Sequence, residues 1–458
     1  MRGRRRNIQS SVVDLHATAT PPARAFLVGL ECGKGDPLWP VEESLAELRQ
    51  LALTAGMVVV GQAVQRLPAP TPAYYIGRGK VEQIAALRAE TGYDIVIFDD
   101  PLTPSQQRNL EEALQVPVMD RSALILHIFA RHARTHEGRL QVELARCEYM
   151  LPRLAGQWTH LERQMGDPGA RGGPGEKQIE IDRRLLRRRI EELRAEIERV
   201  RRHRALYRTN RARHGVPVVA LVGYTNAGKS TLLNALSQAN VLAEDKLFAT
   251  LDPTTRRVRL PSGRVALVSD TVGFIQKLPP TLVAAFRATL EELEGADVLV
   301  HVVDTTHRHG FEQSLTVFQV LKDLGLDQKP QVTALNKIDR LAAGLGPHAG
   351  LDEILAREPA LQELLRAYPN AVPISAARGW GLDALLATVE RLLSRDLVPL
   401  TVRIPYRQGR LVALFKEHGS VQAEEFESDA VLLRGRLPPH LLATFAPYQV
   451  AGRLPVGD

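Results

Sequence analysis

The sequence predicts an α/β protein with a doubly wound, mostly parallel sheet over residues 215–396. Three smaller units accompany that sheet: an N-terminal α/β domain (25–135), a long antiparallel helical hairpin (136–214) and a small C-terminal α+β domain (397–458). Three observations support this. Apolar strands and helices alternate over both α/β regions. Heptad-spaced apolar residues lie between them. The 458 residues have room for roughly three domains.

The composition is that of a globular protein, with 44% hydrophobic and 24% charged residues. No run approaches the roughly 18 apolar residues that a membrane span needs. The two cysteines, Cys32 and Cys147, lie far apart in the sequence and favour a reducing compartment, so we expect a cytoplasmic protein. Residues 1–24 are Arg-rich and poor in acids. A disordered basic tail is the simpler interpretation, and an organelle transit peptide is the alternative.

The N-terminal α/β domain is predicted from short apolar runs separated by amphipathic stretches. Residues 25–29, 57–60 and 94–98 are expected to be strands, and residues 41–55 and 80–91 to be helices. The glycine-rich turn Gly77-Arg-Gly-Lys80 precedes a helix and could bind phosphate. A simple glycine turn at the start of a helix is the commoner explanation.

The hairpin is predicted from apolar residues that recur at steps of three and four. Each arm is expected to hold about 25 residues. Residues 166–175 are rich in Gly and Pro, so they should form a non-helical tip, and Pro152 should kink or break the first arm. The two apolar seams consist of Leu140, Leu144, Cys147, Leu151, Leu154, Trp158, Leu161 and Met165, and of Leu186, Ile190, Leu193, Ile197 and Val200.

The hairpin also concentrates positive charge. Residues 131–213 carry 21 basic and 12 acidic residues, a net charge of +9, whereas the whole chain has +7. Arginine supplies 49 of the 59 basic residues and binds phosphate in a bidentate manner. The hairpin is therefore a candidate surface for RNA phosphates. A solvated coiled coil, with Arg and Glu paired along each helix, is the alternative.

The central sheet is predicted from strands at residues 218–222, 265–269, 298–303, 331–335 and 372–375. Helices are expected at residues 284–293, 315–324 and 382–393. Alternation of this kind is typical of a doubly wound fold, which binds its ligands at the carboxyl ends of the strands.

A P-loop motif follows the first of these strands. Residues 223–230 read Gly-Tyr-Thr-Asn-Ala-Gly-Lys-Ser and begin a helix. The backbone N–H groups of such a loop surround phosphates, and the helix N-terminus adds a positive dipole. We expect Lys229 to reach the β- and γ-phosphates and Ser230 to ligate Mg²⁺. The predicted contacts are Gly223, Tyr224, Thr225, Asn226, Ala227, Gly228, Lys229, Ser230 and Thr231.

A second motif, Asp270-Thr-Val-Gly273, follows the strand at residues 265–269. A carboxylate at this position can hold the Mg²⁺ shell through water, and the glycine can donate its N–H to the γ-phosphate. The predicted contacts are Asp270, Thr271, Val272 and Gly273.

Two further motifs predict guanine recognition. In Asn336-Lys-Ile-Asp339, Asp339 presents two acceptors to the N1–H and 2-amino groups of guanine. ATP lacks the 2-amino group and would leave buried oxygens unpaired. Ser375-Ala-Ala377 fits the loop whose backbone N–H meets the guanine oxygen. The predicted contacts are Asn336, Lys337, Ile338, Asp339, Ser375, Ala376 and Ala377. Together, the motifs predict an enzyme that hydrolyses GTP to GDP and phosphate.

The first switch is predicted between the P-loop helix and the strand before Asp270. One threonine there should ligate Mg²⁺ and sense the γ-phosphate. Thr250, Thr254 and Thr255 compete, and we prefer Thr250, in part on the family resemblance described below. The predicted contacts are Phe248, Ala249, Thr250, Leu251 and Asp252. Ser230 and Thr250 are then the metal ligands, and Lys229, Thr250 and Gly273 form the catalytic group.

Two residues predict how hydrolysis proceeds. Many GTPases place glutamine after the glycine of the second motif to orient the attacking water, but this chain has Phe274. We therefore expect slow intrinsic hydrolysis that another residue or a partner accelerates. Asn226 in the P-loop could help to hold K⁺, or it could serve loop packing alone.

These motifs resemble those of the HflX family of translation-associated GTPases. The resemblance rests on Gly-Tyr-Thr-Asn-Ala-Gly-Lys-Ser-Thr, Phe-Ala-Thr-Leu-Asp-Pro-Thr and Asp-Thr-Val-Gly-Phe-Ile, and on Gly172-Gly-Pro-Gly-Glu-Lys-Gln-Ile-Glu180 and Gln141-Val-Glu-Leu-Ala145 upstream. It covers nearly the whole chain from about residue 25. The resemblance implies the four-part organisation given above. It also implies binding to the large ribosomal subunit and its rRNA, with the hairpin tip near the peptidyl-transferase region.

The resemblance further implies that the protein splits or rescues stalled or idle ribosomes, that the ribosome stimulates its GTPase, and that the N-terminal domain binds ATP. We expect a monomer. Two alternatives stay open: an rRNA- or tRNA-maturation GTPase without ribosome splitting, and a switch whose coiled coil binds a protein partner.

Overall fold

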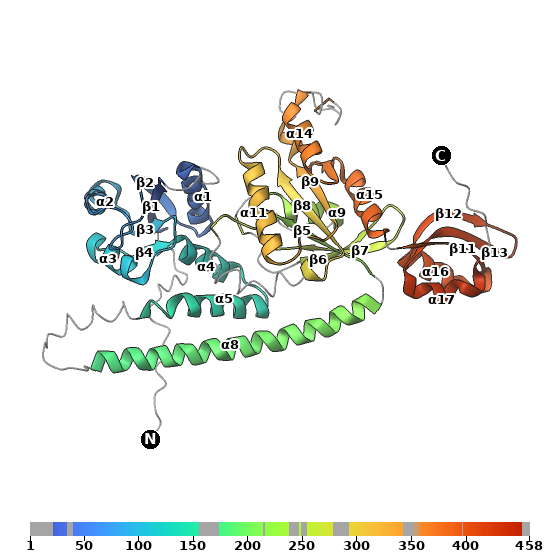
Figure 1. Cartoon of the computed structure of the whole chain (residues 1–458), viewed down its shortest axis with the longest axis horizontal. Helices are drawn as coiled ribbons and strands as arrows, with labels where there is room; N and C mark the ends of the chain where they lie inside the picture. The colour runs from blue at the N-terminus through green and yellow to red at the C-terminus, as the bar shows by residue number, and fades with distance from the viewer. Residues whose placement is uncertain are drawn as a thin grey trace, which may run out of the picture.

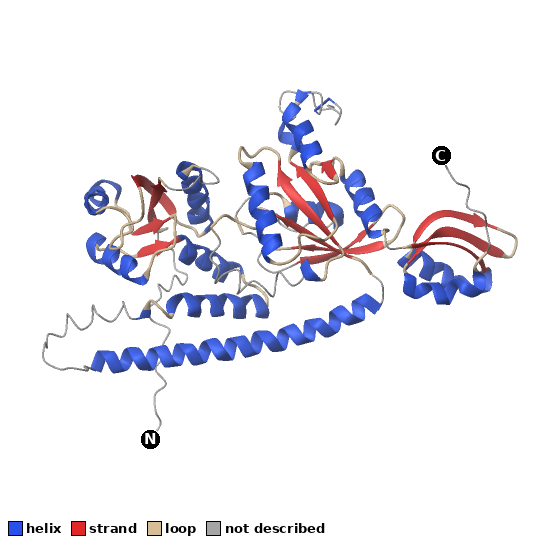
Figure 2. Cartoon of the chain, viewed as in Figure 1, coloured by secondary structure: helices blue, strands red, loops and turns tan. Residues whose placement is uncertain are grey.

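The computed structural model describes residues 22–33, 40–154, 174–213, 216–237, 247–248, 254–277, 293–341, 353–354, 357–395 and 397–450. Three sheets follow one another along the molecule, and one long helix, α8, runs beside the first two (Figure 1). The helices and strands group around these sheets as an N-terminal domain, a central domain and a C-terminal domain (Figure 2).

The N-terminal sheet is parallel, in the order β2-β1-β3-β4. Six consecutive residues of β1 are buried, the pattern of a strand covered on both faces. The three predicted strands and two predicted helices are present, and the sequence analysis missed α3, β4 and α4. The elements are β1 (Arg24–Cys32), α1 (Val41–Thr54), β2 (Val58–Leu67), α2 (Arg78–Thr91), β3 (Ile95–Phe98), α3 (Pro104–Leu114), β4 (Val118–Asp120) and α4 (Arg121–His132).

Two helices, α5 (His136–Met150) and α8 (Pro174–Arg213), lie side by side and run in opposite directions (Figure 1). Their contact is made by residues of the two predicted seams: Leu140, Leu144, Ile190, Leu193 and Ile197 are buried together. The seam prediction is thus confirmed for these five residues and for Cys147 and Leu151, which pack against them. Trp158, Leu161 and Met165 lie outside the described residues.

The second arm is longer than the expected length of about 25 residues, because α8 holds 40. In the first arm α5 holds 15 residues, and residues 155–173 lie outside the described residues. Pro152 lies in the turn after α5, where a helix must end at an interior proline. The last two residues of the predicted non-helical tip are helical. Pro174 and Gly175 belong to the first turn of α8, a position where proline is tolerated. Residues 166–173 lie outside the described residues.

The central sheet has the order β10-β9-β8-β5-β7-β6, and all its pairs are parallel except β6 with β7. The predicted mostly parallel sheet is confirmed. Alternate residues of β5 pack on opposite faces: Ala220 and Val222 in one core, Val219 and Leu221 in another. The elements are β5 (Val218–Gly223), α9 (Lys229–Ser237), β6 (Thr254–Arg259), β7 (Val265–Asp270), β8 (Val298–Asp304), α11 (Gly310–Asp323), β9 (Gln331–Asn336), α12 (Ile338–Leu341), α14 (Pro359–Ala367), β10 (Ala371–Pro373) and α15 (Leu382–Leu393).

Of the helices predicted in this domain, 315–324 falls on α11 and 382–393 on α15, whereas 284–292 lies outside the described residues. The C-terminal sheet is antiparallel, in the order β11-β13-β12, as expected of an α+β unit. Its elements are β11 (Val398–Pro405), α16 (Gly409–His418), β12 (Ser420–Phe426), β13 (Ala430–Leu437) and α17 (Leu442–Phe445). Within the described part of the chain, no helix is long and apolar enough to cross a bilayer.

The N-terminal and central domains share one apolar core. Phe129 of α4 meets Phe248 edge to face, with ring centroids 4.6 Å apart. Tyr224 and Phe274 belong to the same buried cluster. The two domains are therefore packed together close to the P-loop.

Candidate nucleotide-binding site

The P-loop joins the end of β5 to the start of α9, the edge at which doubly wound sheets bind ligands. Gly228 has a φ of +97°, and a Cβ there would lie 2.3 Å from Nδ2 of Asn336. Only glycine fits this position, because it tolerates the left-handed backbone and leaves room for the neighbouring side chain.

Lys229 is buried at the start of α9. Its Nζ donates to the carbonyl oxygens of Gly223 and Tyr224 at 3.1 and 2.8 Å. Burial lowers the pKa of Lys229 to about 8, although the carboxylate of Asp270 opposes this. A buried ammonium at a helix N-terminus suits a polyanionic ligand.

Ser230 and Asp270 lie together on adjacent elements. The Ser230 hydroxyl donates to Oδ2 of Asp270 at 2.7 Å, and Asp270 ends β7, which pairs with β5. A hydroxyl and a carboxylate are the hard oxygen donors that Mg²⁺ prefers, so this pair fits the metal. With a nucleotide bound, Mg²⁺ there would neutralise phosphate charge. Thr250, the other predicted ligand, lies outside the described residues, as do Ala249, Leu251 and Asp252.

Gly273 lies directly over the P-loop. A Cβ on Gly273 would come within 2.8 Å of the Thr225 Cα and 2.9 Å of the Lys229 Nζ. The following residue, Phe274, hydrogen-bonds the loop on both sides: its N donates to the Gly223 oxygen at 3.1 Å, and its oxygen accepts from Thr225 N at 2.7 Å. The Phe274 ring is buried in the interdomain core, so it cannot orient a water molecule.

The base-recognition motifs meet at the carboxyl end of β9. Asn336 donates from Nδ2 to the Ala227 oxygen at 2.8 Å and accepts at Oδ1 from Ala376 N at 3.0 Å. The Ser375 hydroxyl donates to Oδ1 of Asp339 at 2.6 Å. Three segments far apart in sequence are thereby fixed relative to one another, with Asp339 at their edge.

Lys337 completes this edge and connects it to the P-loop. Its Nζ donates to the Asn226 oxygen at 2.8 Å and pairs with Asp304 at 2.6 Å. Asn226 itself is exposed, with a φ of +61°. The P-loop and both base-recognition motifs therefore form one hydrogen-bonded assembly.

Several predicted contacts have side chains that face elsewhere. The Phe248 ring packs on Phe129, and the Tyr224 hydroxyl reaches Glu47 of α1 at 2.6 Å. Thr271 donates to the Leu221 oxygen at 2.7 Å, whereas Val272 and Ile338 are buried in the core. These positions stay predicted contacts, which would reach a nucleotide through their backbone.

The residues that join this site to the N-terminal domain were not predicted from the sequence. Lys277 pairs with Asp100 at 2.7 Å and contacts Asp99, while Arg121 pairs with Asp99 at 2.7 Å. No local pattern marks them, because their partners lie more than 20 residues away in sequence. The nearest signal is the position of Lys277, four residues after Gly273.

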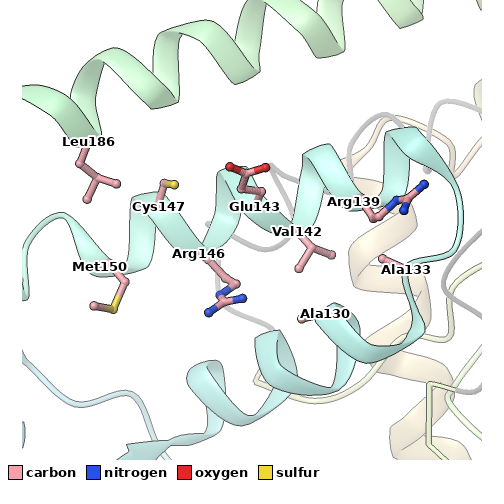
Figure 3. A pocket seen from close by; sticks show the side chains of 9 residues that line it. All are labelled: Ala130, Ala133, Arg139, Val142, Glu143, Arg146, Cys147, Met150 and Leu186. Atoms are coloured by element: carbon pink, nitrogen blue, oxygen red, sulfur yellow. The ribbon is translucent and has the colours of Figure 1, made fainter. Parts of the chain in front are cut away.

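A cavity of about 400 Å³ lies elsewhere, between α4, α5 and α8 (Figure 3). Val142, Met150 and Leu186 contribute apolar walls, and Arg139 and Arg146 stand at its margin. It contains none of the predicted nucleotide contacts.

Sequence comparison covers most of the chain with four family models. They are described as GTP-binding GTPase N-terminal (residues 42–130), GTP-binding GTPase Middle Region (132–211), 50S ribosome-binding GTPase (218–337) and HflX C-terminal domain (360–440).

Curated relatives are similar over nearly their whole length. The GTPase HflX of Caldanaerobacter subterraneus is 43% identical over 90% of this chain and 91% of its own. The GTPase HflX of Magnetococcus marinus is 46% identical over 87% and 89%, and that of Escherichia coli K12 is 43% identical over 86% and 90%. A solved GTP-binding protein from Sulfolobus solfataricus, in complex with GDP, aligns with a TM-score of 0.41 at 26% identity, over 81% of this chain and 99% of that chain.

Proposed function

The chain belongs to the HflX family of GTPases, and from this premise we propose that it is a GTP-driven factor that binds the large ribosomal subunit and splits or rescues stalled or idle ribosomes. GTP is its substrate and Mg²⁺ the usual companion of the nucleotide. In this proposal, Lys229 holds the phosphates, Ser230 and Thr250 ligate Mg²⁺, Gly273 senses the γ-phosphate, and Asn336 and Asp339 select guanine.

One observation supports the ribosomal part of the proposal: α8 carries arginine along the face opposite its seam. Arg184, Arg187, Arg188, Arg199 and Arg202 are exposed, and helical spacing places them on one side. The seam residues Ile190, Leu193 and Ile197 occupy the other.

Only some of the arginines on this face form ion pairs within the helix. Arg188 pairs with Glu192, and Arg202 with Glu198. Arg184, Arg187 and Arg199 have no ion pair among the described side chains. A long rigid helix with such a face suits the phosphates of rRNA, where each contact releases counterions. One family model that matches the central domain is also described as a 50S ribosome-binding GTPase.

Pelleting with ribosomes tests this function. The intact protein, with a non-hydrolysable GTP analogue, should co-sediment with large subunits, and affinity should fall steeply as salt rises. A variant with Arg184, Arg187 and Arg199 changed to Gln should bind more weakly, with a salt slope reduced by about 2 to 3. The matched control changes Arg407, Arg410 and Arg434 of the C-terminal domain, which are also exposed. Equal losses in the two variants would refute a specific role for α8.

The alternative is a GTPase that matures rRNA or tRNA without splitting ribosomes. Sedimentation profiles separate the two: conversion of whole ribosomes to subunits with GTP favours the first, and binding to precursor particles alone favours the second. Deleting residues 166–173 should abolish splitting while leaving GTP hydrolysis by the free protein unchanged.

The remaining parts of the proposal concern ions and assembly. In this proposal the protein acts as a cytoplasmic monomer. Asn226 helps to hold K⁺. The N-terminal domain binds ATP, a proposal that rests on family resemblance alone. Equal hydrolysis rates in Na⁺ and K⁺ would dismiss the K⁺ site. Unchanged ATP binding after Lys229→Ala, with GTP binding lost, would separate an N-terminal ATP site from the P-loop.

A further inference from the structure

A buried cluster of charges connects the N-terminal domain to the phosphate side of the nucleotide site. We call it the interdomain charge cluster: Glu47, Asp99, Asp100 and Arg121 from the N-terminal domain, and Lys277 from the central domain. Arg121 is fully buried, and its guanidinium contacts both Glu47 and Asp99. Buried charges are tolerated only when they are paired and hydrogen-bonded.

The cluster needs both domains to be complete. Asp99 is fully buried, accepts from the Ser44 hydroxyl at 2.6 Å, and contacts both Arg121 and Lys277. Burial alone would raise the pKa of Asp99, but Arg121 and Lys277 together hold it below its usual value. Burial likewise opposes the charge of Lys277, and Asp99 and Asp100 outweigh it and raise its pKa. Lys277 is therefore an integral partner of the acids across the interface.

Two short paths lead from the cluster to the phosphate site. Tyr224 of the P-loop donates its hydroxyl to Glu47 at 2.6 Å and accepts from Gln276 N at 2.9 Å. Lys277 follows immediately and adopts a φ of +55°, a left-handed conformation that is unusual for lysine. Such a conformation persists only where surrounding contacts determine it. The segment from Gly273 to Lys277 is thus fixed at its far end by the N-terminal domain.

The near end of the segment lies where a γ-phosphate must fit. A methyl-sized group on Gly273 would already be 2.9 Å from the Lys229 Nζ. A phosphate oxygen that accepts from both Lys229 and the Gly273 N–H needs a normal hydrogen-bond distance of about 2.8 Å to each. The position of this segment relative to Lys229 therefore sets how well a γ-phosphate fits between the two groups, whereas GDP has no phosphate there.

We propose that Lys277, held by Asp99 and Asp100, is a latch through which the N-terminal domain keeps Gly273 close to Lys229 and so disfavours GTP relative to GDP. The inference rests on the phosphate site proposed above. A binding partner that moves the N-terminal domain away from Lys277 releases the segment from Gly273 to Lys277. The affinity of the protein for GTP then rises. Binding of GTP and rearrangement of the N-terminal domain then favour each other reciprocally.

The test compares affinities for GDP and for a non-hydrolysable GTP analogue, both with Mg²⁺, by calorimetry on the full chain. Lys277→Met and Asp100→Asn should each tighten binding of the GTP analogue about 5- to 10-fold, a coupling at the lower end of the usual range. Affinity for GDP should change less than about twofold in either variant. The double variant should show no further gain, because each change opens the same contact.

The controls exclude a general structural effect. Lys277→Arg should retain the parental ratio of the two affinities, because it preserves the charge. Lys416→Met breaks an ion pair of 2.7 Å with Glu424 in the C-terminal domain and should leave both affinities unchanged. Asp100 is less buried than Asp99, so Asp100→Asn supplies a folded variant should Lys277→Met unfold the protein.

The latch is overturned if both affinities change equally, if neither changes, or if the single effects simply add. Failure of the underlying phosphate site looks different: binding of the GTP analogue would then survive Lys229→Ala, whatever the residue at position 277.

Discussion

The two ends of the nucleotide site are built differently. The base end is stabilised within the central domain alone, since Asn336, Lys337 and Ser375 hydrogen-bond the P-loop and Asp339. The phosphate end is shared between domains, since Tyr224 and Lys277 extend from it to the N-terminal domain. Under the proposed function, recognition of guanine would be constant, while the response to the γ-phosphate would depend on how the N-terminal domain is placed.

The difference has a physical cause. The base end depends on hydrogen bonds among loops that follow neighbouring strands of one sheet, so the sheet fixes their positions. The phosphate end depends on charges whose partners come from a separate sheet, so its geometry follows the interface. The largest expected effect is accordingly at the centre of that interface.

Arg121→Met should destabilise the protein most, because it leaves Glu47 and Asp99 buried without their shared cation. Removing one partner of a buried charge pair typically costs about 3–5 kcal/mol. The free energy of unfolding, measured with urea, should fall by that amount. Arg78→Met is the control, since Arg78 makes an exposed pair with Glu82 and should change stability by less than about 1 kcal/mol. A loss below 1 kcal/mol for Arg121→Met would show that the cluster is not a stabilising element.

Asp339→Asn tests whether the base end acts independently of the phosphate end. The affinity for GTP should fall about 100-fold, and that for xanthosine triphosphate should rise, because the amide donates where the carboxylate accepted. The same loss is expected when Asp339→Asn is combined with Lys277→Met, since independent sites add. An effect that depends on residue 277 would mean that the two ends are coupled.

His301 offers a smaller test within the sheet that supports both ends. It is buried in β8, and burial, aided by the nearby charge of Lys229, lowers its pKa to about 3. The unfolded chain has a histidine pKa near 6.5, so protons bind the unfolded state preferentially as the pH falls below about 6.5. The free energy of unfolding should therefore drop by about 2 kcal/mol between pH 7 and pH 5. The size of the drop follows from the difference of about 1.5 pH units between pH 5 and the histidine pKa of the unfolded chain.

A His301→Gln variant should lose this part of the pH dependence, as seen in urea unfolding at several pH values. Its control is His307→Gln, at an exposed residue in the turn before α11. If His301→Gln retains the full slope between pH 7 and pH 5, other groups are responsible for it.

The sequence predicted the central fold well, because its strands are long apolar runs and its P-loop has a fixed context. The short β4 and the helix α4 were missed, since Asp120 both ends the strand and caps the helix, accepting from Ala123 N at 2.8 Å. In the hairpin, heptad spacing identified the buried seam but not the helix lengths, which depend on where Pro152 and Pro174 fall.

The candidate site shows the same division. Motif spacing was enough to bring Lys229, Asp270 and Asn336 together, because each lies at or after the carboxyl end of a strand in one mostly parallel sheet. It could not reveal that Tyr224 faces Glu47, 177 residues away in sequence, or that Phe248 packs on Phe129. Those contacts arise from docking two domains, and no local pattern encodes them.

The central claim is a guanine-specific triphosphate pocket formed around Lys229 and Asp339. Equilibrium titration of the intact chain with GTP and with ATP, each with Mg²⁺, tests it most directly when Lys229→Ala is measured alongside. The account predicts at least about 100-fold tighter binding of GTP, and loss of that binding in the variant. Equal affinities for the two nucleotides, or GTP binding that survives Lys229→Ala, would contradict it.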